Sequence, residues 1–153
     1  MRKEVKRMDV MTNDVVFGEM IYKHRWFKKE TLSFFGKEWD ITIVAKAFSG
    51  KPITDEQRNA YQWLKDNLTE VDNILYDVTS GYINDNCQEF AEYWSGARMV
   101  NTPSDLAQII SLKTILFKKD GGILVLSDCP WDEHGIAIQL KPDVEIGSQD
   151  IFL

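Results

Sequence analysis

The clearest pattern along the chain is an alternation of side-chain type over residues 39–46. Trp39, Ile41, Ile43 and Ala45 alternate there with Asp40, Thr42, Val44 and Lys46. A period of two, rich in β-branched residues, predicts a strand that buries one face. Strand-like stretches also precede it at residues 15–22 and 25–28. The first third of the chain is therefore predicted to be an antiparallel meander of two or three strands.

Residues 54–94 change to the three-to-four-residue apolar spacing of amphipathic helices. Thr54 is suited to cap a first helix over residues 54–68, because Gln57 stands three residues later, as in a capping box. A second helical pattern covers residues 71–94, and we expect it to bend or break at Gly81. The core residues predicted on these helices are Leu64, Leu75 and Phe90.

The last third returns to strand patterns. Residues 104–110 fit a short helix and residues 112–117 a strand, and Asp120-Gly121-Gly122 then predicts a hairpin turn. Further strands are predicted at 123–126, 135–140 and 144–146, with a turn through residues 127–130 between the first two.

Strands, then helices, then strands without regular strand–helix–strand alternation predict an α+β fold. We expect an antiparallel sheet or sheets from the N- and C-terminal strands, with the two central amphipathic helices packed on one face. A chain of 153 residues fits one domain. Residues 1–14 are expected to be a polar lead-in and residues 15–153 the domain.

Charge and cysteine content narrow the expected partners and compartment. The formal net charge of −6 disfavours nucleic acid and anionic membranes, and it leaves a basic protein as a partner. No apolar stretch reaches membrane-spanning length, and no secretory signal follows the basic N-terminus. We therefore expect a cytoplasmic protein. Its two cysteines, Cys87 and Cys129, are expected to be free thiols, with a single disulfide as the alternative.

The segment 129–135, Cys-Pro-Trp-Asp-Glu-His-Gly, gathers most of the candidate chemistry. His134 is suited to act as a base or metal ligand oriented by Asp132 or Glu133, and Cys129 with His134 is a conceivable nucleophile and base. The alternative, which we favour, is a structural turn held by a hydrogen bond from His134. If its ring is buried, the change His134→Ala should then cost about 1–3 kcal/mol of stability.

No residue is assigned a catalytic or metal-binding role, and no cofactor is expected. The candidate binding residues are Trp131, Asp132, Glu133, His134 and Asp150. Elsewhere Asp85, Glu89 and Glu92 fall at helical spacing and are expected to form a solvated acidic face.

The C-terminal third resembles a group of uncharacterised bacterial domains. The residues that carry the resemblance are the turn Trp131-Asp132-Glu133-His134-Gly135, the apolar strand after it, and the closing Gly147-Ser148-Gln149-Asp150. The resemblance implies a domain of unknown function and no reaction. In size and acidity the chain also looks like the immunity proteins of bacterial toxin systems.

Two functions remain after these observations. The first is a non-catalytic protein-binding domain, specifically an immunity-type inhibitor of a basic toxin, which the negative charge and aromatic content favour. The second is a hydrolase or metal-dependent enzyme centred on Asp132, Glu133 and His134. The enzyme requires these side chains to converge in a concave pocket, whereas the binding domain requires an exposed acidic or aromatic surface.

Overall fold

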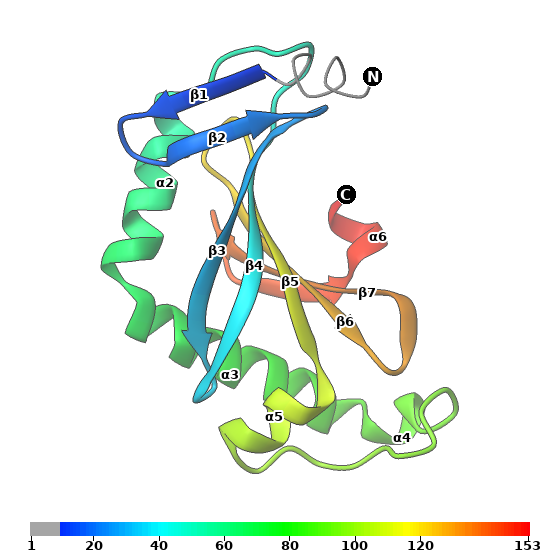
Figure 1. Ribbon diagram of the computed structural model, residues 1–153. Helices are drawn as coiled ribbons and strands as arrows, with labels where there is room; N and C mark the ends of the chain where they lie inside the picture. The colour runs from blue at the N-terminus through cyan, green and yellow to red at the C-terminus, as the bar shows by residue number, and fades with distance from the viewer. Residues whose placement is uncertain (1–9) are drawn as a thin grey trace, which may run out of the picture.

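The computed structural model describes residues 10–153 and places eight strands in one sheet (Figure 1). The strands are β1 (Val10–Asp14), β2 (Gly18–Tyr22), β3 (Trp26–Phe34), β4 (Lys37–Ala45), β5 (Ser111–Phe117), β6 (Ile123–Cys129), β7 (Asp132–Lys141) and β8 (Glu145–Ser148). The helices are α2 (Asp55–Asp66), α3 (Leu68–Asp85), α4 (Cys87–Phe90), α5 (Pro103–Ile109) and α6 (Gln149–Phe152). A mostly antiparallel sheet with separate helices confirms the α+β class. No helix among residues 10–153 is long and apolar enough to cross a membrane.

The strands follow one another across the sheet in chain order, and all neighbours are antiparallel except β4 and β5. In that pair Thr42–Ala45 run parallel to Thr114–Phe117. Parallel neighbours need a long crossover, because the chain must return to the same end of the sheet. The helical segment between β4 and β5 supplies it. The expectation of purely antiparallel strands is therefore wrong at this central pair.

The N-terminal meander has four strands rather than two or three. Residues 10–14, expected to belong to the polar lead-in, form β1 and pair with β2; residues 1–9 lie outside the described residues. The Asp14 carboxylate fixes the β1–β2 turn by accepting hydrogen bonds from the backbone N–H groups of Val16 and Phe17, both at 3.0 Å. Strand β4 matches the alternation at Trp39, Ile41, Ile43 and Ala45, which are all buried, but Val44 on the opposite face is buried as well.

The capping box predicted for α2 is confirmed. The Thr54 hydroxyl accepts from the Gln57 backbone N–H at 3.1 Å, and the Gln57 side chain accepts from the Thr54 N–H at 2.9 Å. Gln57 is fully buried, and its amide also donates to the carbonyls of Lys46 and Phe117. These two residues adjoin the ends of β4 and β5, so one side chain fastens α2 to the parallel pair.

The second predicted helix is divided at a different residue from the one expected. Helix α3 passes through Gly81 without interruption, and a β-carbon there would have no neighbour within 4 Å. The division comes at Asn86, whose side-chain amide donates to the Tyr82 carbonyl at 2.8 Å. Short α4 and a series of turns follow, so the predicted extent of the helix to residue 94 is also wrong.

The helices pack against the sheet and against each other through one connected core. Helix α2 contacts β5 and α3, while α3 also contacts β7, β8 and α5; Figure 1 shows α3 running across the direction of the central strands. Leu64 and Leu75 are completely buried, and Phe90 is 5% exposed, as predicted for core residues.

Candidate binding site

The β6–β7 hairpin forms one wall of the site. Its turn consists of Pro130 and Trp131, and Cys129 pairs with Asp132 across it. Strand β7 thus begins at Asp132 and not at Gly135, and β6 extends through Cys129. The predicted turn at residues 127–130 is therefore displaced toward the C-terminus, and Asp132, Glu133 and His134 belong to a strand.

Trp131 attaches this hairpin to the helices. Its ring stacks on Phe90 of α4, with centroids 4.3 Å apart and planes 5° from parallel. Tyr82 of α3 and Trp94 complete the cluster, with centroids 6.4 Å and 5.7 Å from Trp131. Only 8% of Trp131 is exposed, so the ring packs below the turn.

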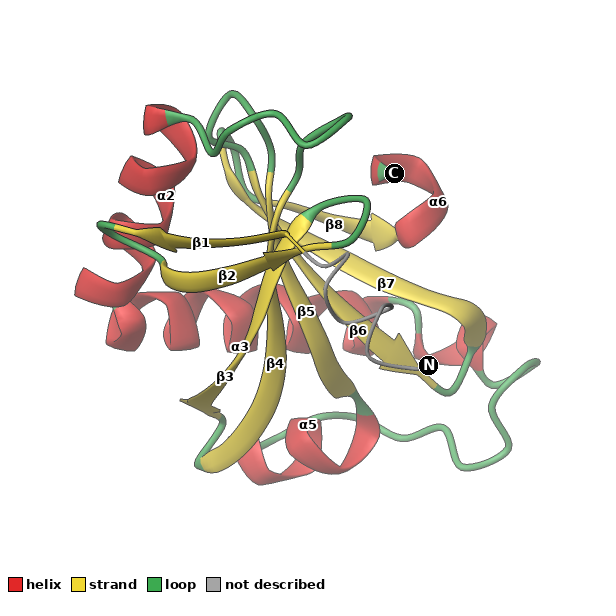
Figure 2. Cartoon of the chain, turned by 45° about the horizontal axis from the view of Figure 1, so that its top comes forward, coloured by secondary structure: helices red, strands yellow, loops and turns green. Residues whose placement is uncertain are grey.

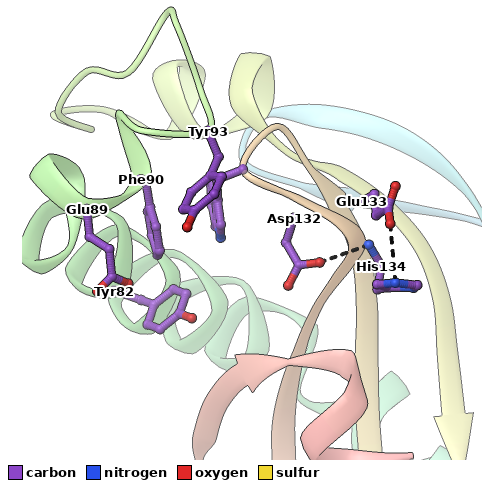
Figure 3. A pocket seen from close by; sticks show the side chains of 8 residues that line it. Tyr82, Glu89, Phe90, Tyr93, Asp132, Glu133 and His134 are labelled. Carbon is purple, nitrogen blue, oxygen red and sulfur yellow. Dashed lines mark hydrogen bonds and ion pairs between the residues drawn. The ribbon is translucent and has the colours of Figure 1, made fainter.

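The polar side chains of the hairpin point toward solvent. One oxygen of Asp132 accepts the backbone N–H of His134 at 2.9 Å. The His134 ring nitrogen Nε2 lies 3.5 Å from a Glu133 carboxylate oxygen, and the two side chains are 63% and 88% exposed, respectively (Figure 3). The stability cost expected for a buried imidazole therefore does not apply, because it is the backbone of His134 that holds the turn.

An open depression lies between this hairpin and the region around α4, with a volume of about 480 Å³. Its lining combines four aromatic residues, three acidic residues and one imidazole: Tyr82, Phe90, Tyr93, Trp131, Glu89, Asp132, Glu133 and His134. We call it the acidic depression. Figure 3 shows the Asp132 carboxylate between the aromatic side chains on one side and the Glu133–His134 pair on the other.

Four of the five candidate residues from the sequence line this depression, namely Trp131, Asp132, Glu133 and His134. The fifth, Asp150, is exposed on α6 and is not among the lining residues. Sequence reasoning did not connect Tyr82, Glu89, Phe90 or Tyr93 with the site. Helical spacing indicated core positions for Tyr82 and Phe90 and a solvated position for Glu89, Tyr93 carried no pattern, and no local signal linked any of them to the later hairpin.

The charges around the depression are mainly negative, and they shift the pKa values of neighbouring side chains. Burial raises the pKa of Tyr82, and the nearby charges of Asp132 and Glu89 raise it further. Burial also raises the pKa of the Cys129 thiol to about 11; backbone hydrogen bonds with Asp132 and Trp131 oppose this rise, and the charges of Asp132 and Asp128 add to it. This thiol is therefore protonated at neutral pH, and a thiol in that state is a poor nucleophile.

The same groups define what the site can do chemically. Carboxylates beside aromatic rings attract cations through charge and through the ring quadrupole. Within residues 10–153, no group of three or more His, Cys, Asp or Glu side chains is placed to hold a metal ion. Cys87 and Cys129 are both free and partly buried.

A family model described as "Domain of unknown function (DUF6985)" matches residues 16–153, a range that includes the whole acidic depression. The resemblance to a domain family of unknown function is thereby confirmed. No match was found among the curated proteins. No match was found among the solved structures either.

Proposed function

The chain belongs to the DUF6985 family of domains of unknown function, and we propose that it is a non-catalytic domain that binds a basic segment of another protein in the acidic depression. The observation that carries this proposal is the combination of an exposed aromatic side chain with three carboxylates around one open hollow.

The aromatic part of the depression is rigid at its base and accessible at its rim. Phe90 and Trp131 are buried and stacked, whereas Tyr93 is 72% exposed. An exposed tyrosine on a rigid base loses little conformational freedom on binding, and aromatic residues are frequent anchors of protein interfaces. A lysine or arginine of the partner could lie against the Tyr93 ring.

The charges favour the same class of partner. Among residues 10–153, Glu89, Asp132 and Glu133 line the depression, and His134 is the one basic residue in its lining. The net charge of −6 extends the negative field beyond the site. Opposite charges accelerate encounter and discriminate against acidic partners, although exposed pairs add little affinity individually.

The alternative is a hydrolase or metal-dependent enzyme that uses Asp132, Glu133 and His134. These residues do line one hollow, but their arrangement favours binding over catalysis. Asp132 accepts a backbone hydrogen bond, and the Glu133 and His134 side chains are largely exposed. General acid–base catalysis needs groups directed at a substrate in a site that excludes water.

An immunity-type inhibitor of a basic toxin is the specific form of this function that we propose. The acidic depression would cover a basic surface of the toxin, and the single-domain size suits a stoichiometric inhibitor. A toxin gene beside the gene for this chain would support this form, whereas a metabolic operon would count against it.

Isothermal titration with a lysine- and arginine-rich peptide tests the site. The double variant Tyr93→Ala/Glu89→Gln removes the exposed ring and one carboxylate, and we expect it to weaken binding by at least about tenfold. The control Met11→Ala/Glu38→Gln removes an exposed apolar side chain and a carboxylate elsewhere. It should bind within about twofold of the wild type.

Equal losses in both double variants would show that the peptide responds only to overall charge, and the proposed site would be wrong. Hydrolytic activity that depends on His134 would instead favour the enzyme. Thermal unfolding of each variant verifies that the changes act on binding and not on folding.

A further inference from the structure

A second exposed aromatic residue stands at the opposite end of the sheet. Phe48 is 62% exposed and lies in the loop that joins β4 to α2, residues 46–54, which we call the Phe48 loop. Figure 2 shows this loop in green beyond the end of the sheet. The turn between β5 and β6 approaches it, because the Thr54 hydroxyl donates to the Lys119 carbonyl at 2.9 Å.

Hydrogen bonds hold the Phe48 loop in place from several directions. The Trp26 indole N–H donates to the Lys51 carbonyl at 2.8 Å, and the Tyr22 hydroxyl donates to the Ala47 carbonyl at 3.2 Å. Within the loop, the Lys51 N–H donates to the Phe48 carbonyl at 3.0 Å. Ser49 adopts a φ of +53°, a costly conformation for a residue with a side chain. The loop is thus built to present Phe48 to solvent.

Basic side chains lie on this loop and on the turn beside it. The Lys119 ammonium lies 4.9 Å from the centre of the Phe48 ring, and Lys46 and Lys51 are exposed on the loop itself. Acidic residues also occur nearby, but two of them have local partners. Asp120 accepts the Gly122 N–H, and Asp55 pairs with Arg58 at 2.8 Å. Among the described residues no ion pair involves Lys46, Lys51 or Lys119, so the surface combines an apolar ring with three exposed lysines beside the carboxylates of Asp55 and Asp120.

This combination is complementary to the acidic depression of the same chain. Strand β6 is preceded by the turn that contains Lys119 and followed by the turn that contains Trp131, so the two surfaces lie at its opposite ends (Figure 1). We propose that the Phe48 loop of one copy docks into the acidic depression of a second copy. Phe48 would pack beside Tyr93, and Lys46, Lys51 and Lys119 would face Glu89, Asp132 and Glu133.

Such a contact joins the Phe48 loop of one copy to the acidic depression of another. Every pair therefore still has one free loop and one free depression. Copies can therefore add head to tail, either until a ring closes or as an open chain. The inference rests on the proposed function, because the acidic depression is one half of the contact. Beyond that function, the inference states that a second copy of the chain competes with a basic partner for the depression.

Sedimentation velocity at rising protein concentration tests the contact. The monomer has a mass of 17.7 kDa. We expect the average mass to rise with concentration at about 20 mM salt and to return toward the monomer at about 500 mM, because salt screens exposed charges. Phe48→Ala and Lys46→Glu/Lys51→Glu should each lower the association constant by at least about tenfold. The control Lys29→Glu/Lys37→Glu makes the same charge change on exposed strand residues and should associate like the wild type.

A charge exchange makes the test specific to two surfaces. Glu89→Lys/Glu133→Lys should also abolish self-association. A mixture of this variant with Lys46→Glu/Lys51→Glu should associate again, because the intact loop of one chain meets the intact depression of the other and the two exchanged surfaces also carry opposite charges.

Three outcomes would overturn the proposal. A wild type that remains monomeric at millimolar concentration and low salt would do so, as would an association unaffected by the loop variants. A monomeric wild type that binds a single-stranded oligonucleotide through Lys46 and Lys51 would assign the loop to nucleic acid. The peptide titration separates this failure from that of the proposed function, because a monomer that binds the basic peptide at Tyr93 refutes self-association alone.

Discussion

Phe90 and Trp131 stack face to face, with ring centroids 4.3 Å apart, although one belongs to α4 and the other to the β6–β7 turn. Both walls of the acidic depression therefore share an aromatic base. This contact holds α4 and the β6–β7 turn in place relative to each other, and the depth of the depression depends on their positions.

We predict that Trp131→Ala lowers the free energy of unfolding by about 3–5 kcal/mol, because a buried ring is replaced by a cavity. Urea denaturation followed by circular dichroism measures the change. Tyr93→Ala is the matched control from the same depression. Its ring is exposed, so its cost should stay below about 0.5 kcal/mol even though it weakens peptide binding. Equal costs for the two variants would contradict the aromatic base.

We predict that Gly135→Ala destabilises the protein by at least about 1.5 kcal/mol more than Gly18→Ala. The two glycines have nearly equal φ values of +81° and +82°. A β-carbon at Gly135 would collide with the Ser127 carbonyl oxygen and lie 2.6 Å from the Gln149 amide nitrogen, whereas one at Gly18 would meet nothing within 4 Å. Thermal unfolding of Gly18→Ala measures the cost of backbone strain alone. Thermal unfolding of Gly135→Ala measures the cost of backbone strain together with the steric collision.

We predict that Asp14→Asn costs about 1.5–3 kcal/mol at pH 7, because the buried carboxylate accepts charge-assisted hydrogen bonds. Burial alone would raise the pKa of Asp14, but hydrogen bonds from Arg58 and from the N–H groups of Phe17 and Val16 hold it below its ordinary value of 3.8. The stabilisation is therefore present above that value and is lost as pH falls through the lower folded pKa.

Urea titrations from pH 7 to pH 2 should show that the difference in unfolding free energy between the wild type and Asp14→Asn becomes smaller below about pH 4. Asp55→Asn is the control, because Asp55 pairs with the same guanidinium at the same 2.8 Å but is 88% exposed. It should cost less than about 0.5 kcal/mol. A difference between Asp14→Asn and wild type that is constant with pH would refute the assigned pKa direction.

We predict that Cys129 reacts slowly with iodoacetamide at neutral pH. In a Cys87→Ser background, the rate should rise with pH toward an apparent pKa of about 11 in the native protein and of 9.0 in urea. A native value below the unfolded one would indicate an activated thiol and would restore Cys129 as a candidate nucleophile.

The elements that sequence patterns predicted well are those whose signals are local. The capping box of Thr54 and Gln57, the alternation in β4 and the Asp120-Gly121-Gly122 turn each depend on residues within one element. Strand β1 was missed because it lies at the edge of the sheet and most of its side chains are exposed, so no apolar alternation marks it. The parallel pairing of β4 with β5 has no local signal at all.

The candidate site was predictable on one side only. The run Trp131-Asp132-Glu133-His134 stands out as a segment, but a segment does not reveal which distant side chains face it. The spacing of Tyr82 and Phe90 indicated positions in the helix core. The helix was expected to break at Gly81, whereas the break lies at Asn86 and places α4 against Trp131. The exposure of Tyr93 depends on the turns after α4, which carry no periodic pattern.

The parallel pair has a kinetic consequence. Every other strand pairing joins strands that are neighbours along the chain. Thr42 cannot pair with Thr114 until the helical segment between β4 and β5 has become compact. Distant pairings carry the largest loop-closure entropy and slow folding. We therefore expect the meander β1–β4 and the hairpins β5–β8 to form as separate units and the seam between them to close last, when the Gln57 amide donates to the carbonyls of Lys46 and Phe117. Because closing the seam is the slow step in this scheme, weakening the seam should slow folding.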